Sequence, residues 1–166
     1  MNIKSSQDLV DEANKSIETL TPVKVKSLVD KNECILIDVR DIRELWKEGT
    51  LKNSKHIPRG MLEFWLDPQS SYFKENKFDP NKKMVLYCAL GMRSALATKS
   101  LIDMGFKNVA HVNGGFDALK QSGLEIVSKK KNNYFKDSVK AYSSLSCPQN
   151  TLLFTTKVGA PKTPFS

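Results

Sequence analysis

The sequence predicts an α/β domain with a mainly parallel sheet, and three observations support this fold class. Two apolar runs, at residues 34–39 and 84–87, have the length and continuous hydrophobicity of strands buried on both faces. A third strand-like segment follows at residues 109–112. Segments with helical spacing separate these strands. Strands that alternate with helices at this spacing are typical of a parallel sheet with crossover helices.

The first half of the chain is expected to form three helices and one buried strand. Apolar side chains recur at helical spacing from Leu9 to Leu20, and Thr21 followed by Pro22 is a signal for a helix N-terminus. Gly49 is a plausible helix C-cap. The expected elements are helices over residues 8–20, 23–29 and 41–48 and the strand over residues 34–39.

The second half is expected to contain the remaining strands. The residue before Pro58 avoids the α region, so an extended segment is expected over residues 55–60. Residues 67–83 are rich in Asp, Pro, Ser, Asn and Lys and are interpreted as a loop. The other expected elements are helices over residues 61–66, 94–104 and 116–121, strands over residues 84–87 and 109–112, and a last short strand over residues 126–127.

The chain divides into three parts on this interpretation. Residues 1–20 form an N-terminal helical extension, and residues 21–128 form the α/β domain. Residues 129–166 form a tail that is first basic and then rich in Ser, Thr and Pro, a composition compatible with disorder. The N-terminal helix either packs on the domain or mediates a dimer, and the sequence leaves the oligomeric state open.

Composition narrows the function classes. The 166 residues include 26 Lys and Arg against 18 Asp and Glu, which gives a net charge of +8. The lysines are scattered, and only residues 129–131 form a run of three, so we expect no nucleic acid partner. No apolar run approaches the ~20 residues of a membrane-spanning helix, so we expect no membrane partner.

The cysteines exclude two further classes of site. The chain has three cysteines, Cys34, Cys88 and Cys147. This small and odd number does not suit a disulfide framework. The only histidines are His56 and His111, and no pair of these residues has metal-ligand spacing, so we expect no metal and no cofactor. Free thiols favour a reducing, cytoplasmic location.

Cys88 lies where chemistry is expected in such a sheet, because ligands bind at the carboxyl ends of parallel strands. The segment YCALGMRS places it between the strand over residues 84–87 and the following helix. Backbone N–H groups of the loop and the helix N-terminus would form an anion-binding site that favours the nucleophilic thiolate. An inert buried thiol is the alternative interpretation.

The loop after Cys88 is predicted to bind the substrate of a cysteine nucleophile. Gly91 would allow a tight turn, and Arg93 would supply a cation for an anionic substrate. The predicted substrate-binding residues are Ala89, Leu90, Gly91, Met92, Arg93 and Ser94.

Three segments resemble the rhodanese-like sulfurtransferase family in its single-domain form. They are LIDVR at residues 36–40, CALGMRS at residues 88–94 and VNGGF at residues 112–116. The resemblance runs from about Thr21 to Val127. It implies a rhodanese-like fold, with a central, mainly parallel five-stranded sheet flanked by helices on both faces.

The resemblance also implies an activity. Cys88 would take the outer sulfur of thiosulfate or of a persulfide donor, become a persulfide, and pass the sulfur on. The implied donor is a small anion such as thiosulfate, and the implied acceptor is a thiol, cyanide or a protein. One family motif, Gly-His-Ile-Pro-Gly-Ala, is changed here. Residues 49–54 fit its place better than residues 55–60, so His56 is expected to be a structural histidine.

Several charged residues carry two interpretations. Asp38 and Arg40 are expected to form a structural ion pair, with support of the Cys88 loop as the alternative. Arg59 either lines the mouth of the pocket or lies on plain surface. Arg43 and Glu44 are expected on a solvated helix face.

Two other functions remain as alternatives to sulfur transfer. Related folds include phosphatases that place five residues between cysteine and arginine, whereas four separate Cys88 from Arg93. A non-catalytic binding module is the other alternative. Cys34 is expected to be a packing residue. Cys147 is expected to be a bystander, with sulfur relay from Cys88 or a disulfide with it as the alternative.

Overall fold

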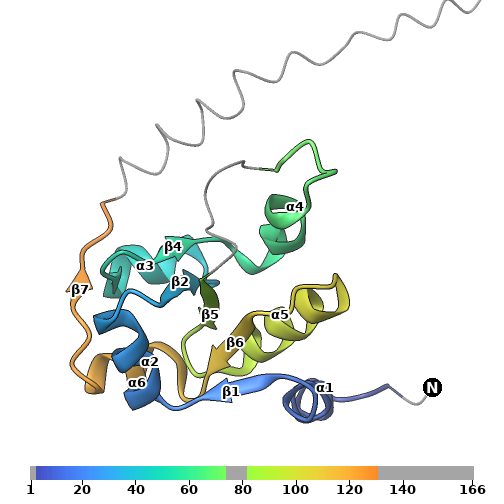
Figure 1. Cartoon of the computed structure of the whole chain (residues 1–166), viewed down its shortest axis with the longest axis horizontal. Coiled ribbons are helices and arrows are strands. Elements are labelled where there is room, and N and C mark those ends of the chain that lie inside the picture. Colours follow the sequence, from blue (N-terminus) through green and yellow to red (C-terminus); the bar gives the residue numbers. More distant parts are fainter. Residues whose placement is uncertain (1–2, 74–81, 131–166) are drawn as a thin grey trace, which may run out of the picture. The chain divides into compact units, whose positions relative to one another are not determined.

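The computed structural model describes residues 3–73 and 82–130 (Figure 1). The predicted tail beyond Lys130, with Cys147, lies outside the described residues. The helices are α1 (Ser6–Asn14), α2 (Pro22–Asp30), α3 (Ile42–Glu48), α4 (Leu62–Leu66), α5 (Met92–Asp103) and α6 (Gly115–Gln121), with a 3₁₀ turn at Arg59–Met61. The strands are β1 (Glu18–Leu20), β2 (Cys34–Asp38), β3 (Thr50–Leu51), β4 (Lys55–His56), β5 (Lys83–Tyr87), β6 (Val109–Val112) and β7 (Ile126–Val127).

The central sheet has five parallel strands in the order β1-β6-β5-β2-β4. The register places Val85 of β5 opposite Leu36 of β2 on one side and Ala110 of β6 on the other. All three side chains are buried, as expected for a parallel sheet that is covered on both faces. The predicted fold class is confirmed.

Two apolar cores lie on the two faces of this sheet. One contains Val25 of α2 and Leu119 of α6, packed on alternate residues of β2, β5 and β6. The other contains Leu62 of α4 and Leu101 of α5, packed on the intervening strand residues. In Figure 1, α2 and α6 lie together on one side of the sheet, and α4 and α5 lie on the other. Because β2 and β5 contribute to both cores, the ends of these two strands are held from both faces.

The predicted helix over residues 8–20 is wrong at its C-terminal end. Helix α1 ends at Asn14, and residues 18–20 form β1, which pairs with β6 at the edge of the sheet. The β-branched Thr19 suits a strand, and Leu20 is buried against the sheet rather than along a helix face. The N-terminal extension is therefore only partly helical, and its last residues belong to the central sheet.

The predicted last strand exists but lies elsewhere. Strand β7 pairs antiparallel with β3 in a separate two-stranded sheet. The sheet therefore has the expected number of strands with different members, because β1 occupies the place expected for residues 126–127. Two-residue strands carry too little periodicity to reveal their partners.

Two other observations concern the fold as a whole. The Thr21 hydroxyl accepts a hydrogen bond from the N–H of Lys24, with Pro22 in the first turn of α2, so the predicted helix start is confirmed. Among residues 3–73 and 82–130, no helix has the length and apolar character needed to cross a membrane.

Candidate active site

Cys88 follows directly after β5 and is almost completely buried, with 1% of its surface exposed. Its Sγ accepts a hydrogen bond from the Gly91 N–H at 3.2 Å. The Ser94 Oγ lies 3.7 Å from the same sulfur. The thiol is therefore enclosed by its own loop and accepts one backbone hydrogen bond, and the Ser94 hydroxyl, which also donates to the Gly91 carbonyl oxygen at 3.0 Å, lies beside it.

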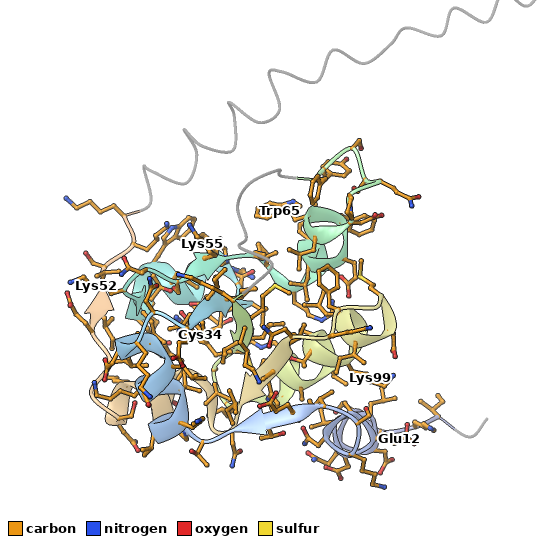
Figure 2. All side chains as sticks on the ribbon, in the orientation of Figure 1. Glu12, Cys34, Lys52, Lys55, Trp65 and Lys99 are labelled. Carbon is orange, nitrogen blue, oxygen red and sulfur yellow. The ribbon has the colours of Figure 1, made fainter. Side chains whose placement is uncertain are left out.

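The other cysteine within the described part of the chain has a different environment. Cys34 begins β2 inside the domain (Figure 2), and its thiol pKa is raised to about 11, mainly because burial disfavours the charged form. A thiol with a raised pKa is a poor nucleophile near neutral pH. The expected packing role of Cys34 agrees with this environment.

The helix after Cys88 begins earlier than the sequence predicted. Helix α5 starts at Met92 rather than Ser94, because Gly91 takes the left-handed conformation with φ of +106° and serves as its N-cap. Left-handed backbone favours glycine, so Gly91 makes the tight turn possible. The first-turn N–H groups of a helix have no partner within the helix. Here that turn begins four residues after the cysteine, which gives the loop an electropositive end.

The VNGGF motif, at residues 112–116, supports the Cys88 loop through close backbone contacts. The Phe116 N–H donates to the Cys88 carbonyl oxygen at 2.7 Å. A Cβ added to Gly115, whose φ is +61°, would lie 2.4 Å from the Ala89 carbonyl oxygen and 2.5 Å from that of Cys88. Only glycine lets the turn after β6 approach the loop this closely. The VNGGF motif thus fixes the position of the Cys88 backbone at the end of β5.

Arg93 forms an ion pair with Glu44 rather than standing free in the loop. Its Nη1 and Nη2 donate to the two carboxylate oxygens of Glu44 at 2.6 and 2.8 Å. The pKa of Arg93 is raised, first by this hydrogen bond to Glu44 and to a smaller extent by the Cys88 sulfur. Arg93 is therefore held by Glu44 in the first turn of α5. The prediction that Glu44 lies on a solvated helix face is wrong, whereas Arg43 is exposed as expected.

Asp38 and Arg40 form the expected structural ion pair. Both side chains are fully buried, and the Arg40 Nη2 donates to the Asp38 carboxylate at 2.9 Å. The same nitrogen donates to the Gly49 carbonyl oxygen at 2.7 Å, and Nη1 donates to Glu48 at 3.1 Å. The predicted C-cap glycine, Gly49, has φ of +78°. The pair therefore ties the end of β2 to the end of α3.

This ion pair reaches the Cys88 loop through a ring contact. The guanidinium carbon of Arg40 lies 3.8 Å from the centroid of the Phe116 ring, a cation–π contact. The backbone N–H of the same Phe116 donates to the Cys88 carbonyl oxygen. Arg40 thus supports the loop indirectly, through Phe116, and does not contact the Cys88 sulfur.

Sequence reasoning missed a buried hydroxyl cluster next to the site. The Thr50 hydroxyl donates to Asp38 at 2.8 Å and lies 2.9 Å from the Tyr87 hydroxyl, which donates to Ser54 at 3.0 Å. Tyr87 immediately precedes Cys88, and burial is the largest cause that raises its pKa. Hydroxyl residues at such separations carry no sequence signal, because only the fold brings them together.

Arg59 and His56 are engaged away from the sulfur. Arg59 donates to the Glu63 carboxylate at 2.7 Å and to the Ser100 hydroxyl at 3.0 Å. His56 Nε2 lies 2.9 Å from the Arg40 carbonyl oxygen, and burial lowers the pKa of this imidazole. The expectation of a structural His56 agrees with these contacts.

The remaining loop residues differ in their exposure to solvent. Leu90 and Met92 are 65% and 42% exposed, whereas Ala89 is half-buried and Ser94 fully buried. The loop that follows Cys88 thus presents two apolar side chains to solvent. No cluster of three or more metal-ligating side chains occurs within residues 3–73 and 82–130.

Two curated proteins are similar to parts of this chain. "Thiosulfate sulfurtransferase/rhodanese-like domain-containing protein 3" of Mus musculus is 32% identical over 97 residues, which cover 56% of this chain and 62% of the mouse protein. "tRNA uridine(34) hydroxylase" of Hamiltonella defensa is 35% identical over 92 residues, which cover 55% of this chain and 25% of the hydroxylase. The chain therefore matches only about a quarter of that hydroxylase.

Two solved structures are similar over three quarters of the chain. A protein of unknown function from Rhodopseudomonas palustris, described as a possible tyrosine phosphatase, is 44% identical with a TM-score of 0.71 and covers 76% of this chain and 97% of its own. The polysulfide-sulfur transferase homodimer of Wolinella succinogenes is 34% identical with a TM-score of 0.60 and covers 75% of this chain and 88% of its own. Residues 21–122 match the family described as Rhodanese-like domain, so this chain belongs to the rhodanese-like family.

Proposed function

We propose that this protein is a sulfurtransferase in which Cys88 carries sulfane sulfur as a persulfide. The observation that carries the proposal is the enclosure of the Cys88 sulfur, with the Gly91 N–H at 3.2 Å and the N-terminus of α5 behind it. Donors directed at a sulfur from fixed backbone stabilise an anion without reorganisation. Such a loop suits a thiolate before the reaction and a terminal persulfide anion after it.

The first half-reaction would transfer one sulfur atom to Cys88. The thiolate attacks the outer sulfur of thiosulfate, the S–S bond of the donor breaks, and sulfite leaves with the electron pair of that bond. In the second half-reaction a thiolate or cyanide attacks the outer sulfur of the persulfide, and the Cys88 thiolate is regenerated. The cycle needs no external oxidant or reductant, in keeping with our expectation of no cofactor.

The loop residues take supporting roles in this proposal. Gly91 supplies the N–H donor, Ser94 supplies a hydroxyl close to the sulfur, and Arg93 supplies a cation in the first turn of α5. Ala89, Leu90 and Met92 border the entrance and would contact donor and acceptor. Asp38 and Arg40 hold the scaffold. Arg59 donates to Glu63 and Ser100, so we assign it no step in the reaction.

A cysteine-dependent phosphatase is a second candidate, favoured by the relative from Rhodopseudomonas palustris described as a possible tyrosine phosphatase. Two features of this chain argue against it. Only four residues separate Cys88 from Arg93, and both Nη atoms of Arg93 are already bound to Glu44. A phosphoryl group needs a wider ring of donors and a guanidinium that faces it.

Two relatives bear on the donor and the acceptor. The similarity to a polysulfide-sulfur transferase favours an inorganic or small-molecule sulfur chain as donor, whereas the similarity to tRNA uridine(34) hydroxylases concerns one segment of much longer proteins and assigns no acceptor. We propose a small thiol or a protein thiol as acceptor, with no nucleic acid, and a cytoplasmic location in which Cys88 stays reduced.

The test is direct sulfur loading of the purified chain. Incubation with thiosulfate should add one sulfur atom to Cys88, seen by mass spectrometry of the peptide, and added cyanide should release thiocyanate in repeated turnover. Cys88→Ser should abolish both signals. Cys34→Ser is the matched control, since it removes the other buried thiol of the described residues and should leave turnover unchanged.

Two results would reject the proposal. One is the absence of any sulfur adduct with thiosulfate and with a small organic persulfide, and the other is full turnover by Cys88→Ser. Release of phosphate from an aryl phosphate, lost in Cys88→Ser, would promote the phosphatase candidate. If the protein has no activity in any of these assays, a non-catalytic binding module is the remaining candidate function.

A further inference from the structure

The feature behind this inference is the carboxylate that occupies Arg93. Both oxygens of Glu44 accept hydrogen bonds from the Arg93 guanidinium, at 2.6 and 2.8 Å, in a two-point pairing. The two side chains are 28% and 42% exposed, so neither is a fully solvated surface group. Arg93, which lies in the first turn of α5 five residues after Cys88, is thus already matched by a negative charge.

Glu44 is held in this place by its own helix. It is the third residue of α3, and its Oε1 also accepts the Asp41 N–H at 3.0 Å, which completes a capping box with Asp41. The far end of α3 is fixed through Glu48, which accepts from the buried Arg40. A carboxylate anchored from two directions does not swing away from Arg93 without breaking its helix cap.

The other two arginines named near the site give no replacement cation. Arg40 is fully buried and donates hydrogen bonds to Asp38, Glu48 and the Gly49 carbonyl oxygen. Arg59 is paired with Glu63. What the loop offers an incoming anion is therefore the backbone N–H groups and the α5 N-terminus, which carry about half a unit of positive charge.

We infer that Glu44 is a specificity-determining residue that lowers the preference of Cys88 for dianionic sulfur donors and favours donors of low charge, such as organic persulfides. Thiosulfate brings two negative charges into a site where Glu44 cancels Arg93. A hydropersulfide brings at most one. In that reaction the Cys88 thiolate attacks the outer sulfur of R–S–SH, the S–S bond breaks, and R–S⁻ leaves, so that atoms and charge balance.

This inference rests on the proposed sulfur transfer and names its donor class. The test compares kcat/KM for sulfur loading from thiosulfate with that from 2-hydroxyethyl hydropersulfide, whose only ionisable group is its S–SH. Glu44→Gln keeps one hydrogen bond to Arg93 but removes the charge. We expect kcat/KM with thiosulfate to rise about fivefold to tenfold at low salt and that with 2-hydroxyethyl hydropersulfide to change less than about twofold.

Two variants control the comparison. Glu63→Gln removes the carboxylate from another partly buried arginine pair, with side chains 34% and 32% exposed, and should leave the donor ratio unchanged. Glu44→Asp keeps the charge on a shorter side chain and should return the ratio to within about twofold of the wild-type value. Thermal unfolding of each variant identifies any that fail to fold.

A second readout needs no turnover. For the Cys88 thiol we compare the rate of alkylation by anionic iodoacetate with the rate by neutral iodoacetamide. The ratio of the first rate to the second should be about threefold higher in Glu44→Gln than in the wild type, and Glu63→Gln should not change that ratio. An unchanged donor ratio and an unchanged alkylation ratio in folded Glu44→Gln would overturn the inference. Loss of sulfur loading from both donors in the wild type would instead reject the proposed function, whatever the alkylation ratio.

Discussion

Two arginines of this domain, Arg40 and Arg93, each bind carboxylates, and the contrast between them separates scaffold from chemistry. Arg40 and Asp38 are fully buried, and Arg40 also donates to Glu48 and to the Gly49 carbonyl oxygen. Arg93 is 42% exposed at the site. Breaking a buried pair leaves an uncompensated charge, whereas a partly solvated pair exchanges its partner for water at low cost. The buried pair therefore fixes structure, and the exposed pair is free to tune reactivity.

The largest effect is expected from removal of the buried arginine. Arg40→Ala leaves the Asp38 carboxylate without its partner in the interior and removes the ring contact with Phe116. We expect a loss of about 3–5 kcal/mol in the free energy of unfolding, measured by urea denaturation. Arg43→Ala is the control, because its pair with Asp41 is on the surface, and its effect should stay within about 0.5 kcal/mol. Equal effects of the two variants would contradict the contrast.

The next prediction tests whether the scaffold reaches the sulfur through the glycine turn. Gly115→Ala would place a Cβ 2.4–2.5 Å from the carbonyl oxygens of Ala89 and Cys88 and impose a left-handed conformation on alanine. We expect a stability loss of about 1–3 kcal/mol and a fall of about tenfold in kcat/KM for sulfur loading, because the loop must move.

Gly123→Ala separates strain from displacement. Gly123 also has a positive φ, of +84°, but nothing lies within 4 Å of the added Cβ. This variant should lose stability to backbone strain and keep its activity. If Gly115→Ala retains full activity once folded, the turn does not position Cys88.

The sequence predicts the scaffold around Arg40 better than the pair of Arg93 with Glu44, because the two depend on contacts of different range along the chain. The buried strands, the Thr21 cap and the loop at Cys88 leave local signals, because each depends on residues adjacent in the chain. The Arg40 pair follows from the LIDVR segment for the same reason. Glu44 and Arg93 lie 49 positions apart, so their pairing depends on tertiary packing and escaped prediction.

Strand β1 shows the same limit within the fold. Residues 18–20 continue a pattern that is compatible with a helix, and only pairing with β6 makes them a strand. The hydroxyl cluster of Thr50, Ser54 and Tyr87 is likewise assembled from separate elements. Contacts between distant segments override local propensity in each case.

A kinetic prediction concerns the exposed arginine itself. Arg93→Ala should raise the KM for thiosulfate about tenfold, because it removes the cation near Cys88 and leaves Glu44 to repel the donor. The free energy of unfolding should fall by less than about 1 kcal/mol, since the pair is partly solvated. Steady-state kinetics and urea denaturation of the same preparation check both parts. Unchanged kinetics would remove Arg93 from the site.

The smallest effect is the pH dependence of the Glu44–Arg93 pair. The Arg93 hydrogen bond is the largest cause that lowers the pKa of Glu44 from its ordinary value of 4.5. A carboxyl group with a lowered folded-state pKa stabilises the protein above its unfolded pKa, and this contribution is lost as the pH falls through the folded value. The coupling energy between the two residues should therefore be present at neutral pH and should be lost as the pH falls below 4.5 and through the lowered folded-state pKa of Glu44.

A double-mutant cycle isolates this coupling from the other carboxylates that titrate in the same range. Wild type, Glu44→Gln, Arg93→Ala and the double variant are unfolded by urea at neutral and acidic pH. We expect a coupling of about 0.5–1 kcal/mol at pH 7, because both side chains are partly exposed and the pair is screened. A coupling that persists unchanged in acid would mean that shape and apolar contact hold the two side chains together, and charge would then not be the property through which Glu44 acts on donor choice.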